Sequence, residues 1–141
     1  MAALVEVAVA SAVVFGALGA PAEHPLAAII GVAMLSALLG MALGLYVSAF
    51  ATSEFQAVQF LPAFVLPQLL ICGLFAARDQ MAGWLEAISW AMPLTYVYDA
   101  LERLALPGSL GGAFWVDLAV IAGAGFVALA LGAATLPRRT G

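Results

Sequence analysis

Four apolar runs, each long enough to cross a lipid bilayer, constrain this chain more than any other feature of its sequence. They lie near residues 1–19, 26–50, 57–77 and 113–136. A transmembrane helix needs about 20 apolar residues to cross a hydrocarbon core roughly 30 Å thick. Because that core offers no water to unpaired backbone groups, an apolar run of this length is expected to form a helix. The sequence therefore predicts an all-α integral membrane protein with four transmembrane helices.

The composition excludes a soluble domain. Of the 141 residues, 66% are hydrophobic and 9% are charged, and the mean hydropathy is +1.15. Soluble domains carry about 25% charged residues, so this chain has too few to cover a globular surface. The formal net charge is -4, and all of the basic residues are arginines. With no basic patch we expect no nucleic-acid partner, and we expect membrane lipid around the chain.

The number of spans bears on the topology. The first run carries Glu6 instead of the positive charge that begins a signal peptide, so we interpret this run as a span. Four spans place both termini on one side of the membrane. Arg138 and Arg139 favour the cytoplasm for both termini. Arg78 and Arg103 lie in the loop on the opposite side of the membrane. Because each side then carries two arginines, charge alone leaves the orientation open.

The second run carries small residues spaced four apart: Ser36, Gly40, Gly44 and Ser48. Residues at this spacing share one helix face, and small side chains there let another helix approach closely. We therefore expect helix packing on this face. A weaker ladder in the last run, Ala124, Ala128 and Gly132, is as easily explained by the abundance of alanine and glycine.

Two prolines lie five residues apart within the third run, at Pro62 and Pro67. Each removes a backbone donor and crowds the carbonyl four residues earlier, which predicts a kinked or loosened helix. Two interpretations stay open. The span bends beside a transport pathway, or the kink is static.

The loop between the third and fourth runs contains two short helical segments, which together cover residues 83–106. Each is too short to cross the bilayer, so the pair predicts a re-entrant helical hairpin or a helix lying flat at the interface. Trp84 and Trp90 suit the headgroup zone. Asp99 and Arg103 are four apart with the acid first, which predicts an ion pair within one helix.

No motif for catalysis or cofactor binding is visible. The sequence lacks a phosphate-binding loop, and His24 has no neighbouring residues that could complete a metal site. We therefore expect no cofactor, no metal and no catalytic residue on this chain. Glu6 is interpreted as the one acid well inside an apolar run, where it is either a proton or cation site or a side chain reaching the interface.

A resemblance to a known family appears when the third run is taken together with the polar residues before it and the loop after it. The sequence FATSEFQAVQFLPAFVLPQLLICGLF, followed by RDQMAGWLEAISWAMPLTYVYDAL, is similar to the C-terminal half of an ABC-2 type transporter permease. The nearest group is the daunorubicin-resistance permeases of bacterial drug exporters. The similarity covers roughly residues 26–137. It implies a six-span protein in which these runs are the third to the sixth, so that residues 1–141 form a partial permease domain.

The resemblance also implies roles for particular residues. An ATPase-facing turn would contain Ser53, Glu54, Phe55 and Gln56. An outer gate would contain Trp84, Glu86, Tyr96, Asp99 and Arg103. Both termini would be cytoplasmic. Two departures from the family stand out: Ala77 and Ala82 replace prolines that are frequent there, and the first two spans with their coupling helix are missing. We expect either a fragment or a second chain that supplies that half.

The function implied is that of a membrane subunit, not an enzyme. Two permease protomers and ATP-binding subunits, which hydrolyse ATP, would export a hydrophobic or amphipathic compound such as a drug or antibiotic across the cell membrane. Two alternatives stay open: a stand-alone four-span proton-coupled drug transporter using Glu6, and a purely structural membrane subunit.

Overall fold

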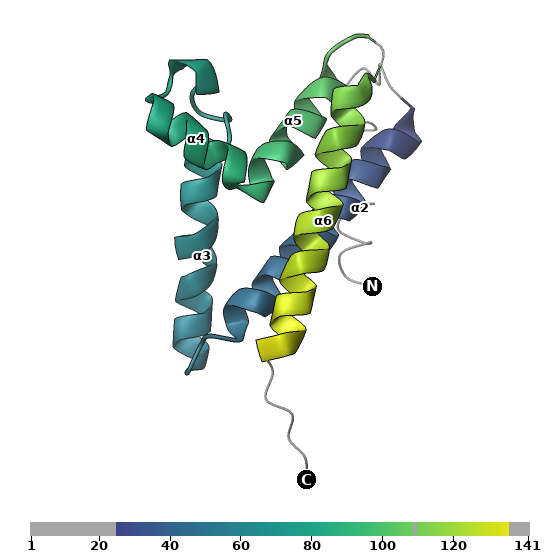
Figure 1. The fold of residues 1–141 in the computed structure, drawn as a ribbon. Helices are drawn as coiled ribbons and strands as arrows, with labels where there is room; N and C mark the ends of the chain where they lie inside the picture. The colour runs from purple at the N-terminus through teal and green to yellow at the C-terminus, as the bar shows by residue number, and fades with distance from the viewer. Residues whose placement is uncertain (1–24, 109, 136–141) are drawn as a thin grey trace, which may run out of the picture.

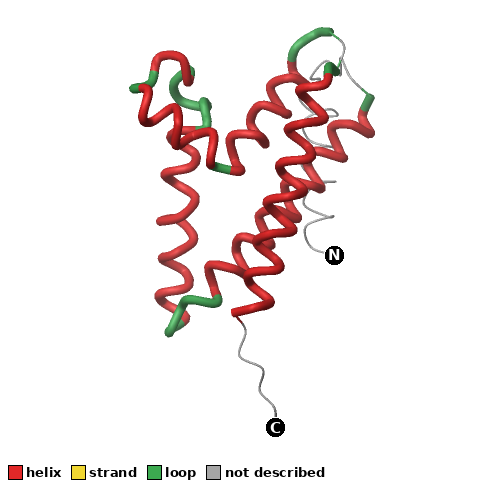
Figure 2. Tube along the Cα trace, viewed as in Figure 1, coloured by secondary structure: helices red, strands yellow, loops and turns green. Residues whose placement is uncertain are grey.

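The computed structural model describes residues 25–108 and 110–135, which form helices joined by short loops (Figures 1 and 2). In chain order these are α2 (Leu26–Ser48), α3 (Glu54–Ile71), the short 3₁₀ helix η2 (Arg78–Gln80), α4 (Gly83–Ala91), α5 (Pro93–Ala105) and α6 (Gly112–Thr135). The all-α prediction is confirmed for this part of the chain. The predicted span 1–19, with Glu6, and the two terminal arginines lie outside the described residues.

Three of the described helices have the length and apolar composition to cross a membrane: Ala27–Ser48, Glu54–Ile71 and Gly112–Thr135. Their outer surfaces carry large apolar side chains such as Leu45 and Phe126, whose exposed fractions are 63% and 75%. Such surfaces are costly in water and not in lipid. The chain is therefore a multi-pass membrane protein, and the fourth span stays a prediction.

The closest helix pair is formed by α2 and α6, which cross along most of their length (Figure 1). The residues of α6 that face the core recur every three or four positions, as expected for one face of a helix. It consists of Phe114, Asp117, Ile121, Gly125, Ala128 and Gly132. A Cβ atom at Gly132 would lie 3.7 Å from the Cα atom of Tyr46, so the two backbones are nearly in contact. Small residues on α6 allow this approach.

The start of α3 differs from the predicted third span. The helix begins at Glu54 instead of residue 57, because Ser53 caps it: its Oγ accepts a hydrogen bond from the Gln56 backbone N–H at 3.2 Å. The Gln56 side chain reaches back, and its Oε1 accepts from the Thr52 backbone N–H at 2.9 Å. This reciprocal arrangement is close to a capping box. The polar entry is therefore the first turn of the spanning helix itself.

The end of α3 also corrects the prediction, since the helix stops at Ile71 and not at residue 77. Gly73 adopts a φ of 108°, a conformation that residues with a Cβ atom rarely adopt. This turn of the backbone ends the helix just after Cys72. The following apolar residues Leu74 and Phe75 lie in an exposed loop. The predicted span was too long because hydrophobicity continues past the residue that ends the helix.

Helix α3 runs through both Pro62 and Pro67 as one element. It makes fewer contacts than the other spans and stands apart from the α2–α6 pair in Figure 1. It contacts α2, α4 and α5, each over a short stretch. The combination of two missing backbone donors and little lateral support makes α3 the least constrained of the described spans.

Helices α4 and α5 form a V in Figure 1. Helix α4 leads away from the end of α3, and α5 returns toward the beginning of α6. Their lengths are 9 and 13 residues, which correspond to about 14 and 20 Å and are too short to cross a bilayer. The vertex lies at Met92 and Pro93, and Pro93 suits the first turn of α5 because it needs no backbone donor there.

Candidate functional site

The vertex of the V is held by side chains from the first turn of α5. Thr95 Oγ1 donates to the Ser89 carbonyl at 2.6 Å, and the Tyr96 hydroxyl donates to the Trp90 carbonyl at 2.8 Å. These are among the last carbonyls of α4, which have no partners within their own helix. Ser89 and Thr95 are fully buried. These carbonyls at the bend therefore have partners within the protein.

The middle of α5 is tied to the loop after α3 by an ion pair. Arg78 Nη2 lies 2.6 Å from Asp99 Oδ1, and the two side chains are 18% and 5% exposed. The Arg78 guanidinium carbon also lies 4.5 Å from the centre of the Trp90 ring, a cation–π contact with α4. The other terminal nitrogen, Nη1, is buried with no hydrogen-bond partner among the described residues. Arg78 thus connects the loop, α4 and α5.

The C-terminal end of α5 is tied to α6. Arg103 Nε donates to Asp117 Oδ2 at 2.9 Å, with Arg103 43% and Asp117 7% exposed. The predicted ion pair between Asp99 and Arg103 is wrong. The two residues share one helix, but Asp99 is buried against Arg78, while Arg103 is half exposed and reaches α6. Partners from other elements take both charges, so spacing along one helix was not decisive.

The other residues of the predicted outer gate do not form one cluster. Tyr96 lies at the vertex, whereas Trp84, at the start of α4, is 68% exposed. Among the described residues, the Glu86 carboxylate makes no hydrogen bond or ion pair. The buried member of α4 is Ser89, and Ile88 faces outward at 41% exposure. The polar face of α4 is thus turned toward the protein.

The four residues of the predicted ATPase-facing turn form the cap and first turn of α3: Ser53, Glu54, Phe55 and Gln56. In Figure 1 this end of α3 lies beside the end of α6, at the opposite end of the molecule from the V. Phe55 is 73% exposed. The structure therefore separates the two predicted sites by the length of the spans.

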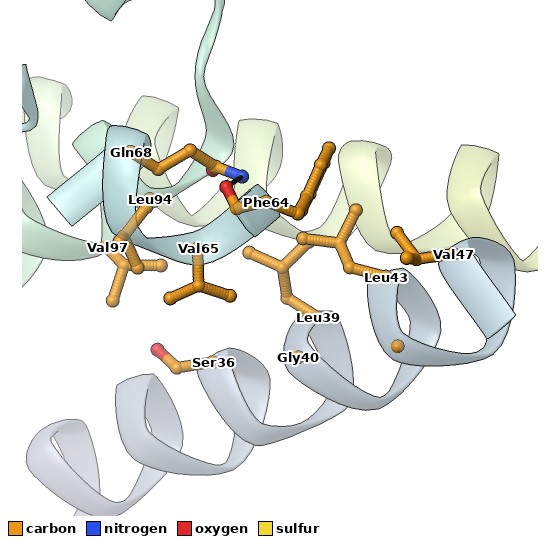
Figure 3. Close-up of a pocket in the computed structure, with 11 residues that line it drawn as sticks. Ser36, Leu39, Gly40, Leu43, Val47, Phe64, Val65, Gln68, Leu94 and Val97 are labelled. Carbon is orange, nitrogen blue, oxygen red and sulfur yellow. Dashed lines mark hydrogen bonds between the residues drawn. The ribbon is translucent and has the colours of Figure 1, made fainter. Parts of the chain in front are cut away.

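An apolar cavity of about 180 Å³ lies between α2, α3 and α5 (Figure 3). Its wall on α2 contains small residues, its wall on α3 contains Phe64, Val65 and Gln68, and α5 contributes Leu94 and Val97. Figure 3 shows Val65 pointing toward Ser36 and Gly40 across the space. Gln68 is 4% exposed, and its Nε2 donates to the Phe64 carbonyl at 3.3 Å.

The predicted packing face on α2 is divided between two hollows. Ser36, Gly40 and Gly44 line the cavity toward α3, and Ser48 lies beside a second hollow toward the end of α6. A Cβ atom at Gly40 or Gly44 would meet nothing within 4 Å. The glycines of this face therefore leave space beside α2, while the close approach to α6 uses the glycines of α6.

Three functional candidates escaped the sequence analysis. Asp117 is an acid within an apolar run, and that position alone could have marked it beside Glu6. Gln68 is a polar residue in the interior of the third run, a signal of the same kind. The role of Arg78 had no signal, because its partner Asp99 is 21 residues away. Within the described residues no His, Cys, Asp and Glu cluster could hold a metal ion.

These features define a class: a multi-pass helical membrane protein with a bent, ion-paired hairpin between two spans. The ABC-2 type transporter family matches residues 1–105, which is most of the chain. The chain belongs to the ABC-2 type transporter family, whose members are membrane permeases. No curated protein matches it. No solved structure matches it either.

Proposed function

We propose that the chain is a permease subunit of an ATP-binding cassette exporter of the daunorubicin-resistance kind. Two protomers and separate ATP-binding subunits move a hydrophobic or amphipathic compound out of the cell by alternating access. The cell membrane holds the complex, with both termini of this chain in the cytoplasm. Family membership supports the transporter role. The observation that carries the rest of the proposal is the V, since a bent hairpin tied to two spans is suited to act as a gate.

The two ion pairs support that gating role. Asp99 attaches α5 to the loop after α3, and Asp117 attaches α5 to α6. A shift of the loop after α3 against α6 must therefore carry the hairpin with it or break one of the pairs. In this proposal the hairpin closes the outer end of the pathway, and it moves when ATP binding at the opposite end displaces α3.

The spans supply the rest of the mechanism. The exposed first turn of α3, with Phe55, receives the movement from the ATP-binding subunit in this proposal. Pro62 and Pro67 let α3 bend, because each removes one hydrogen bond from the helix. Substrate is held by apolar surfaces and not by ion pairs. This agrees with the pairing of Asp99 and Asp117, the buried acids among the described residues, with arginines.

Uptake of daunorubicin into inside-out membrane vesicles tests the proposal. The vesicles come from cells that make the protein naturally and from the same cells with the gene deleted. We expect uptake that needs ATP, survives a protonophore and disappears on deletion. Asp99→Ala should lower uptake more than the amount of protein in the membrane. Uptake that the protonophore abolishes would instead favour the proton-coupled alternative. Equal uptake by vesicles from cells with and without the gene would favour the structural-subunit alternative.

A further inference from the structure

We propose that the cavity between α2, α3 and α5 is a binding site, inside one copy of the chain, for a small amphipathic molecule. The ligand is one ring or a short alkyl chain that carries a hydroxyl or amide group. The site is formed by one copy of the chain, so binding there can be measured without a second protomer or ATP.

The size and lining of the cavity determine the apolar part of the ligand. Its volume is about 180 Å³, and nine of its eleven lining residues are apolar or glycine. An engineered apolar cavity of about 150 Å³ stays free of water and binds benzene. The space here fits one ring or a short chain, and it is too small for a whole phospholipid.

Gln68 determines the polar part of the ligand. Gln68 is 4% exposed in an otherwise apolar wall of α3, and the structure shows one hydrogen bond for its side chain, from Nε2 to the Phe64 carbonyl. A primary amide offers two donors and a carbonyl acceptor. A hydroxyl or amide on the ligand would use the remaining bonding capacity of this side chain.

The glycines of α2 keep the cavity open. Side chains at Gly40 and Gly44 would enter free space, since nothing lies within 4 Å of a Cβ atom at either position. Gly40 is exposed and Gly44 is partly buried, so the cavity opens to the surface along this part of α2. Here two larger residues would fill the space without meeting any obstacle at their first atom. The positions at which a ligand can be excluded by mutation are therefore defined.

An octanol derivative that carries an alkyl diazirine is the probe. The full-length chain, purified in detergent, is photolabelled, and the labelled residues are identified by mass spectrometry. We expect saturable labelling of cavity residues such as Leu39, Val65 and Val97, removed by excess octanol. Gly40→Leu should reduce this labelling about tenfold, because a leucine side chain that fills the cavity removes apolar contacts that the probe would make there. Gly31→Leu, at an exposed glycine of the same helix with equally open surroundings, should leave it unchanged.

The polar contact is tested by comparing two competitors in the wild type and in Gln68→Leu. Octanol should compete better than octane by roughly five- to tenfold in the wild type, the effect of one hydrogen bond. The two should compete equally in Gln68→Leu. If Gly40→Leu does not fold, Gly44→Leu replaces it. Labelling confined to lipid-facing residues, or cavity labelling that Gly40→Leu and Gly44→Leu leave intact, overturns the proposal. Loss of daunorubicin uptake with intact labelling would contradict only the proposed transport.

Discussion

The two interfaces of α2 use the same kind of residue to opposite effect. Toward α6 the backbones nearly touch, and the residues that permit this are Gly125, Ala128 and Gly132 of α6. Toward α3, the small residues belong to α2 itself, and they border a cavity instead of a neighbouring backbone. One side of the fold is closed and the other is open. A stripe of small residues therefore permits close packing, but the opposing helix decides whether packing occurs.

Helix α5 bridges the two sides. It packs on α6 and α2 through Val97, Ala100 and Leu104, which belong to the buried core. On the open side it is held mainly by Arg78, which also contacts α4. The closed side has apolar packing in addition to its ion pair, and the open side relies on charge. The two ion pairs should therefore differ in their importance to stability.

The largest effect is expected from Arg78→Ala. It leaves Asp99, which is 4% exposed, as a buried and unpaired charge. Removing one partner of a buried ion pair costs about 3–5 kcal/mol. We expect thermal unfolding in detergent, followed by circular dichroism, to show a loss of this order. The double variant Arg78→Ala/Asp99→Ala should regain part of it.

The matched change on the closed side is Arg103→Ala. Arg103→Ala also leaves a buried acid, Asp117, without its partner, but Arg103 is 43% exposed, so water already screens this pair and can reach Asp117 once the arginine is removed. We therefore expect a smaller loss than for Arg78→Ala, of roughly 1–3 kcal/mol. Equal losses for the two arginine variants would contradict the division into an open and a closed side.

The second prediction concerns the glycines. Gly132→Leu inserts a side chain where a Cβ atom already lies 3.7 Å from the backbone of Tyr46. Overpacking of this kind costs about 1–3 kcal/mol. We expect a matching fall in the free energy of unfolding, whereas Gly40→Leu on the open side should leave it unchanged or raise it. A loss for Gly40→Leu as large as that for Gly132→Leu would mean that the cavity is not available space.

The third prediction concerns the link between α3 and the hairpin. At Gly73, φ is 108° and a Cβ atom would lie 3.2 Å from Cε1 of Tyr98. Gly73→Ala should therefore cost about 1–3 kcal/mol from backbone strain, with crowding of Tyr98 in addition. Gly83→Ala, at a glycine with open surroundings, is the control and should cost little. Both are measured by the same unfolding experiment, and equal values would exclude a strained link.

The comparison also shows what the sequence could predict. Spans 26–50 and 113–136 were located within two residues at each end, since continuous hydrophobicity coincides with the helices Leu26–Ser48 and Gly112–Thr135. The third span was displaced because capping at Ser53 and the conformation of Gly73 set its ends, and neither depends on hydrophobicity. The ion pairs join residues 14 and 21 apart. Such pairs depend on how the helices fold back on each other.

The smallest effects are expected at the vertex of the V, where the open and closed sides meet. Thr95→Val removes a buried donor to the Ser89 carbonyl and keeps the shape of the side chain. That carbonyl still accepts from the Met92 backbone N–H at 3.0 Å, so the loss should be about 1 kcal/mol and not the full cost of an unsatisfied group. Tyr96→Phe removes an exposed hydrogen bond to Trp90 and should cost less. Unfolding measured for both variants in one detergent gives the order, and a larger loss for Tyr96→Phe would show that the exposed hydrogen bond, and not the buried one, holds the bend.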